Sequence, residues 1–205
     1  MLVPSMTLQE IRREINLEKP IIFRKVQFLI HDFMRAKRPH GKDVFVRHYD
    51  YVSKYKNKWI FRIGISRHQA ELSYLVYYYN DIGLVGILVF DDDDELMYLT
   101  SHLFKRFNER LRLNLNTPRE IMVKFLDEFP GFNGKRIETI EPGVYKMFYG
   151  STAGYFLGIN NMNLKFIKMN TFITHDMLKG EQHETADYLR KEIAKYVPNA
   201  FKMNG

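Results

Sequence analysis

The chain has 205 residues, of which 45% are hydrophobic and 27% charged, and its formal net charge is +7. This composition is typical of a globular protein, and the absence of cysteine excludes disulfides and thiolate metal sites. The first residues lack the apolar core of a signal peptide, and the longest apolar run, IGLVGILVF, is about half of what a membrane span needs. We therefore expect a cytoplasmic protein without a membrane segment.

Helical and strand-like patterns follow one another in the first 90 residues. Thr7 and Glu10 have capping-box spacing, which predicts a short helix over residues 7–16. Pro20 predicts the start of a second helix, whose apolar residues recur at helical spacing. Alternating patterns and the turn sequences KYKN and NDIG then predict four strands, at residues 43–53, 57–66, 71–80 and 82–90.

The second half repeats this order of elements after the acidic run DDDDE. One helix is predicted from residue 101 to about 113, and a second begins at Thr117 and Pro118, which suit the cap and the first helical position. Further elements are predicted at residues 136–140, 143–151, 154–160 and 164–174 (strands) and 184–197 (helix). We expect an α+β fold of antiparallel β-meanders with segregated helices, divided into regions 1–94 and 95–205 or built on one shared core.

The stretch SHLFKRFNER places a histidine and two arginines in one row of a helix. His102, Arg106 and Arg110 are four residues apart, along the border of an apolar stripe. His102 falls in the first turn, where free backbone N–H groups and the helix dipole attract anions. A neutral imidazole beside two guanidinium groups suits cleavage of a phosphate ester, because it exchanges protons near neutral pH while the arginines stabilise phosphoryl oxygens. The structural alternative is that Arg106 and Arg110 pair with nearby carboxylates or cover apolar surface.

Residues 96–175 resemble the barnase/EndoU/colicin/RelE superfamily of small, metal-independent ribonucleases and toxin domains. The resemblance rests on the SHLFKRFNER helix, the second helix TPREIMVKFL and a last strand that ends in NTFIT. It implies that His102 is the acid/base residue and that Arg106 and Arg110 stabilise the phosphate. It also implies that Thr171 or Thr174 presents a hydroxyl to the substrate. No cofactor or metal is expected.

Other patterns have weaker chemical meaning. Residues 91–95 offer oxygen ligands for Mg²⁺ or Ca²⁺ but lack the spacing of an EF-hand, so a solvated turn is the preferred interpretation. His175 and Asp176 are interpreted as the cap of a short helical turn. In YVSKYKNKW, the residues Lys54, Lys56, Lys58 and Trp59 combine cations with an aromatic ring, which suits single-stranded nucleic acid; a hairpin tip with half-buried aromatics would look the same.

The sequence favours a metal-independent endoribonuclease that cleaves RNA by transesterification. The alternative is a non-catalytic α+β module that binds nucleic acid or a protein. The expected partner is RNA or a protein, and the sequence leaves the oligomeric state open.

Overall fold

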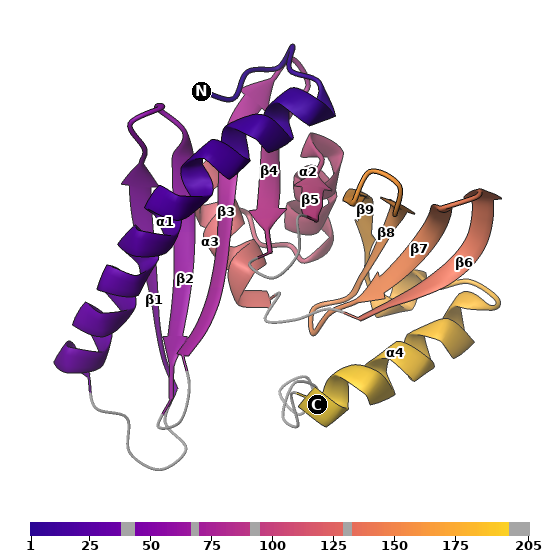
Figure 1. Ribbon diagram of the computed structural model, residues 1–205. Helices are drawn as coiled ribbons and strands as arrows, with labels where there is room; N and C mark the ends of the chain where they lie inside the picture. Colours follow the sequence, from indigo (N-terminus) through magenta and orange to yellow (C-terminus); the bar gives the residue numbers. More distant parts are fainter. Residues whose placement is uncertain (38–43, 67–69, 91–94, 129–132, 197–205) are drawn as a thin grey trace. The chain divides into compact units, whose positions relative to one another are not determined.

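The computed structural model describes residues 1–37, 44–66, 70–90, 95–128 and 133–196 (Figure 1). Its helices and mostly antiparallel strands confirm the α+β class. The chain divides into two compact units, Met1–Val89 (unit 1) and Phe90–Gly205 (unit 2). The acidic run predicted as the boundary includes residues 91–94, which lie outside the described residues. Among the described helices, none combines the length and apolar content that a membrane crossing needs.

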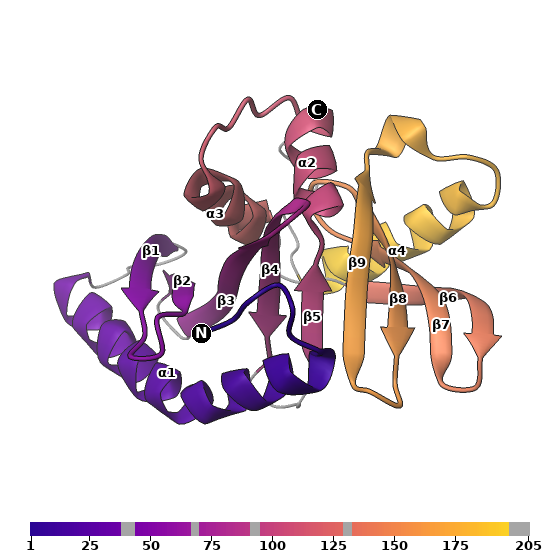
Figure 2. The same ribbon diagram turned by 90° about the horizontal axis from the view of Figure 1, so that it is seen from above.

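Unit 1 begins with a single helix, α1 (Leu8–Ala36), where the sequence pattern predicts two. Thr7 and Glu10 form the predicted capping box. Pro20 lies inside the helix, although an internal proline costs about 3 kcal/mol. The buried residues recur every three or four positions on both sides of it: Ile11, Ile15, Glu18, Ile22, Val26, Leu29 and Phe33. Because each fully buried aliphatic side chain contributes about 1.5–3 kcal/mol, continuous burial outweighs the proline. Figure 2 shows that α1 bends along its length, as a proline helix commonly does.

Four strands complete unit 1, at positions that agree with the sequence pattern. They are β1 (Phe45–Val52), β2 (Lys58–Ile65), β3 (Ala70–Asn80) and β4 (Gly83–Val89). Each pairs antiparallel with the next. The NDIG turn between β3 and β4 is closed by Asn80, whose side-chain oxygen accepts hydrogen bonds from the backbone N–H groups of Ile82 and Gly83, both at 3.0 Å.

Helix α1 lies against the strands of unit 1 (Figures 1 and 2), and a buried carboxylate holds it there. The side chain of Glu18 is fully buried. It accepts hydrogen bonds from Ser53 Oγ, from Asn57 Nδ2 at 3.0 Å and from Trp59 Nε1 at 2.7 Å. These donors come from the β1–β2 connection and the start of β2, so one acidic residue ties the helix to a whole hairpin. We call these four side chains the Glu18 network.

Unit 2 begins with a short strand that the sequence pattern does not reveal. β5 (Leu96–Leu99) pairs parallel with β9 (Phe166–Ile173), with Leu99 opposite Met169. Four residues are too few to show a period of two, and the partner lies about 70 positions later in the chain. All other described pairings in unit 2 are antiparallel, and the strand order is β5-β9-β8-β7-β6.

Two helices follow β5 and begin as predicted. They are α2 (Ser101–Arg110), capped by Thr100, and α3 (Pro118–Glu128), whose cap residue Thr117 exchanges hydrogen bonds with Glu120. The sequence pattern extends the first of them to about residue 113. Arg112 and Asn114 have φ values of 52°, in the left-handed region, so the helix ends earlier.

The remaining strands form the rest of the unit 2 sheet. They are β6 (Asn133–Glu141), β7 (Val144–Gly150) and β8 (Tyr155–Asn161), and β9 follows. A bulge interrupts the pairing of β8 with β9: Leu157 lies opposite Thr171, whereas Gly158 lies opposite Met169. A Cβ atom on Gly158 would lie only 2.4 Å from the carbonyl oxygen of Lys168, so the close approach of the two strands requires glycine here.

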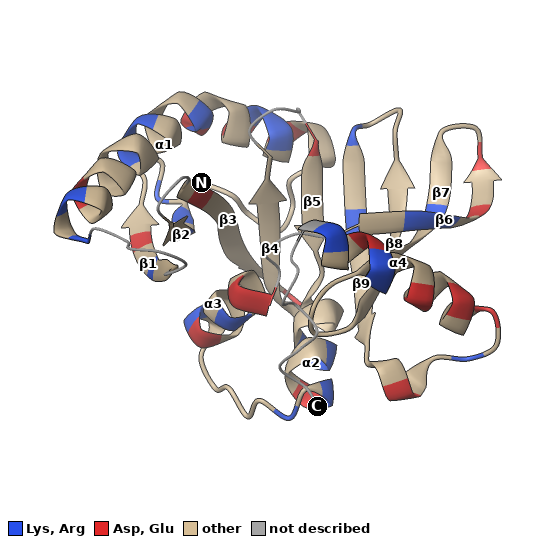
Figure 3. Ribbon diagram, turned by 90° about the horizontal axis from the view of Figure 1, so that it is seen from below, with Lys and Arg blue, Asp and Glu red and all other residues tan. Residues whose placement is uncertain are grey.

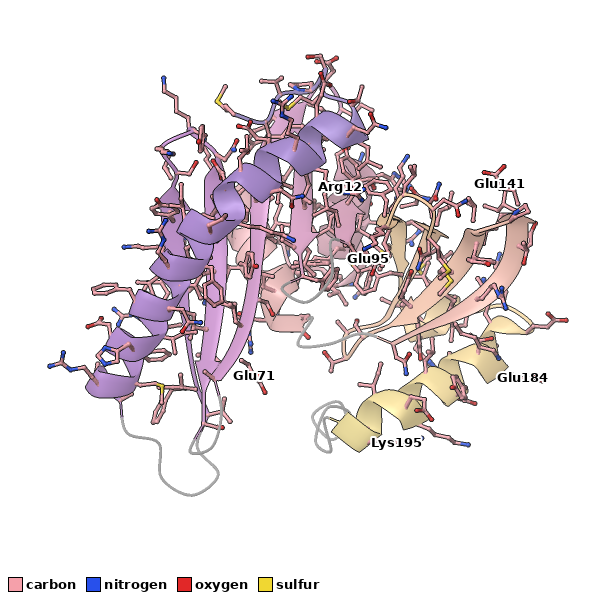
Figure 4. The ribbon with its side chains drawn as sticks, in the orientation of Figure 1. Arg12, Glu71, Glu95, Glu141, Glu184 and Lys195 are labelled. Carbon is pink, nitrogen blue, oxygen red and sulfur yellow. The ribbon has the colours of Figure 1, made fainter. Side chains whose placement is uncertain are left out.

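The unit 2 sheet has helices on both faces. On one face, Phe107 of α2 and Phe125 of α3 pack edge-on against Phe172 and Phe156 of the sheet. On the other face lies α4 (Gln182–Tyr196), where buried side chains form a common cluster: Phe148, Tyr155, Ile173, Leu178, Ala186 and Leu189. Figure 4 labels Glu184 near the start of α4 and Lys195 near its end. A short 3₁₀ turn, η1 (His175–Met177), links β9 to α4, as the sequence predicts.

Candidate nucleic-acid interface and candidate active site

The net charge of the protein is confined to one of its two units. Residues 1–89 contain 15 Lys and Arg against 8 Asp and Glu, a balance of +7. Residues 90–205 contain 16 of each and are neutral on balance. Figure 3 shows basic residues distributed along α1. The excess charge that would attract a polyanion therefore belongs to unit 1, whereas the predicted active-site row belongs to unit 2.

The lysines predicted to bind nucleic acid lie on an exposed hairpin. Lys54, Lys56 and Lys58 are all exposed, and Lys56 has a φ of 62° at the tip of the loop. The Nζ atom of Lys54 lies 4.8 Å from the ring centre of Tyr55, and that of Lys58 lies 6.0 Å from the ring centre of Tyr77. These cations are accessible, and rings lie beneath two of them.

The assignment of Trp59 to this interface is wrong. Its side chain is only 1% exposed, and its indole N–H is committed to Glu18. A base cannot stack on a ring whose faces are covered, so Trp59 is part of the core of unit 1. The sequence places it directly after the exposed Lys58 because adjacent residues of a strand point to opposite faces.

Cations also lie over aromatic rings between α1 and β1. Lys25 Nζ lies 5.5 Å from the ring centre of Phe28 and 5.9 Å from that of Tyr51. Further along, Lys37 Nζ lies 5.5 Å from the ring centre of Phe45. Phe28 is 63% exposed, so one of these rings is open to a stacking partner. Lys58 points to the side of the sheet opposite Trp59 and α1, so the cations of unit 1 flank both sides of the β1–β2 hairpin. We call Lys25, Lys37, Lys54, Lys56 and Lys58 together the basic face.

Helix α2 is held at both ends by backbone carbonyls of β9. At its start, the backbone N–H of Thr100 donates to Met169 O at 3.3 Å, and Thr100 Oγ1 donates to Asn170 O at 3.1 Å. At its end, the Arg110 guanidinium donates to the carbonyl of Phe172. The helix that carries the predicted row therefore lies beside the C-terminal part of β9.

The three residues of the row differ in how they are engaged. His102 is exposed in the first turn. Arg106 donates to Glu109 at 2.9 Å, so the structural alternative considered for the arginines holds at this position. Arg110 is committed to β9, and burial, followed by the charge of Arg106, lowers its pKa. His102 and Arg110 are eight residues apart, which is roughly 12 Å along a helix. The Cα atoms of these two residues are therefore too far apart for one phosphate to lie against both positions of the helix.

The two threonines predicted to join the row lie in different surroundings. Thr171 is opposite Leu157, which packs into the cluster beneath α4. Cross-strand neighbours share a face, so Thr171 belongs to the face of the sheet away from the Phe107–Phe172 contact. Its assignment to the row is therefore wrong. Thr174 precedes η1, and its hydrogen bond to Asp176 lowers the pKa of that carboxyl.

A further set of polar side chains gathers where the sequence shows no motif. A cavity of about 210 Å³ in unit 2 is lined by residues 151–155 together with His175 and Arg190. Tyr155, His175 and Arg190 come from β8, η1 and α4, separated by 20 and 15 positions. No local spacing predicts such a group, because β-pairing and helix docking bring it together. In the described part of the chain, no three His, Asp or Glu side chains are arranged to hold a metal.

Comparison with protein families, with curated proteins and with solved structures found no match to this chain.

Proposed function

We propose that the protein binds single-stranded RNA through the basic face of unit 1. The observation that carries this proposal is that unit 1 has the whole net charge of +7 while unit 2 is neutral on balance. A surface that neutralises phosphates releases the counterions condensed on the nucleic acid, which favours binding. The exposed ring of Phe28 beside Lys25 provides a stacking site that suits an unpaired base.

The test is the salt dependence of binding. The probe is a fluorescent single-stranded RNA of about 12 nucleotides, within the site sizes of such proteins. Anisotropy is measured between about 50 and 200 mM salt. Replacing Lys54, Lys56 and Lys58 by Gln removes three contacts, so the slope of log K against log salt should become shallower by about 2.

The matched control removes three exposed lysines of unit 2, at Lys105, Lys179 and Lys191. This variant has the same net charge as the first, so equal loss of affinity in both would show that overall charge, and not the basic face, binds the RNA. Absence of binding at low salt would refute the proposal. Equal affinity for single-stranded DNA would remove RNA as the preferred ligand.

We propose RNA cleavage by the α2 row as a second function. The position of α2 supports it, because the helix presents exposed His102 and half-exposed Arg106 beside β9. His102 would take the proton of the ribose 2′-hydroxyl while the 2′-oxygen attacks phosphorus. The 5′-oxygen would leave with a proton from solvent, producing a 2′,3′-cyclic phosphate. Arg106 would exchange Glu109 for the phosphate, since an exposed ion pair contributes about 1 kcal/mol or less.

Cleavage is tested with the same RNA in EDTA. His102→Ala should slow the reaction about a hundredfold, the scale of general acid–base catalysis. The control is His31→Ala, which removes an exposed histidine of α1. Full activity in His102→Ala would disprove the role of His102. RNA binding without any cut strand would leave the first proposal alone.

A further inference from the structure

The cavity between the β7–β8 connection, η1 and α4 brings together three groups that donate hydrogen bonds. The Tyr155 hydroxyl lies 3.4 Å from Nδ1 of His175. Arg190 lines the same cavity, and its positive charge acts on the Tyr155 phenol. These groups are independent of the α2 row, because Tyr155 belongs to the cluster beneath α4.

The phenol of Tyr155 is held in its protonated, donating form. Its side chain is only 3% exposed, and its ring stacks on Phe148 with centroids 5.1 Å apart. Burial raises the pKa of Tyr155 above its ordinary value of 10.0, and this effect exceeds the opposite effect of Arg190. The hydroxyl is therefore a neutral donor at physiological pH, on a residue that lines the cavity.

The wall formed by residues 151–154 is fixed by its own hydrogen bonds. Ser151 donates from both its backbone N–H, at 2.8 Å, and its hydroxyl, at 3.1 Å, to the carbonyl of Gly154. Thr152 Oγ1 donates to the carbonyl of Glu128 at 2.9 Å, which ties the loop to the end of α3. Gly154 has a φ of 157°, and a Cβ there would lie 2.6 Å from the carbonyl of Ile173. The cavity is thus formed before any ligand enters.

Two other ionisable side chains lie close to this group. Asp187, one turn before Arg190 on α4, raises the pKa of Tyr155 by its negative charge, so it lies within electrostatic range of the same phenol. The ring of His183 meets that of His175 edge-on, with centroids 6.1 Å apart. Asp187 is exposed and its charge is screened by solvent, whereas Tyr155 is buried.

We infer that this cavity binds a phosphoryl group, with Arg190, His175 and Tyr155 as its donors. A guanidinium, an imidazole and a phenol approach from three different elements, which suits an acceptor with oxygens in several directions. At about 210 Å³ the cavity is smaller than typical sites for drug-sized ligands, so it takes a phosphate or the end of a phosphate monoester. This site goes beyond RNA binding by the basic face and lies in the unit without net charge.

Calorimetric titration with inorganic phosphate tests the inference on the full chain. Wild-type protein should bind one phosphate saturably. Arg190→Gln should weaken binding about tenfold or more, and Tyr155→Phe, which keeps the buried ring, about threefold or more. The control Lys191→Gln removes the same charge from the next residue of α4 and should leave the affinity within about twofold of wild type. Circular dichroism establishes that each variant is folded.

Two outcomes would overturn the inference: no saturable phosphate binding, or equal weakening in Arg190→Gln and Lys191→Gln. The source of the phosphoryl group is identified with a nucleoside 5′-monophosphate and with short RNAs that end in a 5′-phosphate or a 5′-hydroxyl. These competitors are used with the Lys54/Lys56/Lys58 variant, so that the basic face does not contribute. Displacement of the bound phosphate by the monophosphate alone indicates a free small-molecule ligand. Displacement by the 5′-phosphorylated RNA but not by the 5′-hydroxyl RNA indicates the end of an RNA strand. Either result supports the site.

Discussion

Replacing Glu18 by alanine should destabilise unit 1 more than most single changes in the chain. The substitution removes the acceptor of the buried Ser53 hydroxyl and Trp59 indole, at about 1–3 kcal/mol for each group, and leaves Asn57 with only its long contact to Glu14. Removing the carboxylate also abolishes the desolvation cost of a buried charge, which offsets part of this loss. The net expectation is about 3–5 kcal/mol, the range found when one partner of a buried polar pair is removed.

Urea unfolding followed by tryptophan fluorescence measures this loss selectively. Trp59 is the only tryptophan, so its emission reports on unit 1. The control is Glu14→Ala, one turn earlier on α1, whose contact with Asn57 is long at 3.4 Å; it should cost about 1 kcal/mol or less. Equal effects of the two substitutions, or a loss below about 1 kcal/mol in Glu18→Ala, would refute the reasoning.

Three further predictions concern unit 2. Gly158→Ala should lower the free energy of unfolding by about 2 kcal/mol or more, because its Cβ would meet the carbonyl of Lys168; calorimetry measures this. The hydrogen bonds that Thr117 donates to Glu120 lower the pKa of this carboxyl below its ordinary value of 4.5. The stability that the carboxylate contributes is therefore present above pH 4.5 and is lost as pH falls through its folded pKa. Thr117→Val should therefore reduce the drop in urea midpoint between about pH 6 and pH 3. Arg110→Met removes a hydrogen bond from α2 to β9, so hydrogen exchange in the last turn of α2 should speed up by about tenfold, as expected for about 1.5 kcal/mol.

Local patterns predicted the elements whose signals are contained within a few neighbouring residues. The strands of unit 1 are marked by apolar runs bounded by turn residues, and Asn80 closes its turn with its own side chain. The caps at Thr7 and Thr117 depend on a residue three positions later. Pro20 predicts a helix start but lies inside α1, because its local cost is visible in the sequence, whereas the continuous burial that outweighs it depends on the folded strands.

The candidate sites were less predictable because they depend on partners far along the chain. The Trp59 assignment failed since only the position of α1 reveals that Glu18 takes its N–H. Helical spacing grouped His102 with Arg110, but the bond from Arg110 to a β9 carbonyl crosses 62 residues. The sequence does not show on which face of the sheet Thr171 lies, because the bulge between β8 and β9 places Thr171 on the face opposite to Met169.

The parallel pairing of β5 with β9 affects the order in which the two units can fold during synthesis. Every described strand of unit 1 pairs with a neighbour in the sequence, so this part is able to fold soon after it leaves the ribosome. β5 cannot pair until residues 166–169 of β9 are synthesised. The cap of α2 likewise lacks its β9 carbonyl acceptors until that strand is made. A nascent chain thus has its basic face well before its His102 helix is anchored. If the basic face binds RNA and the helix cuts it, a nascent chain would bind RNA before it could cleave it.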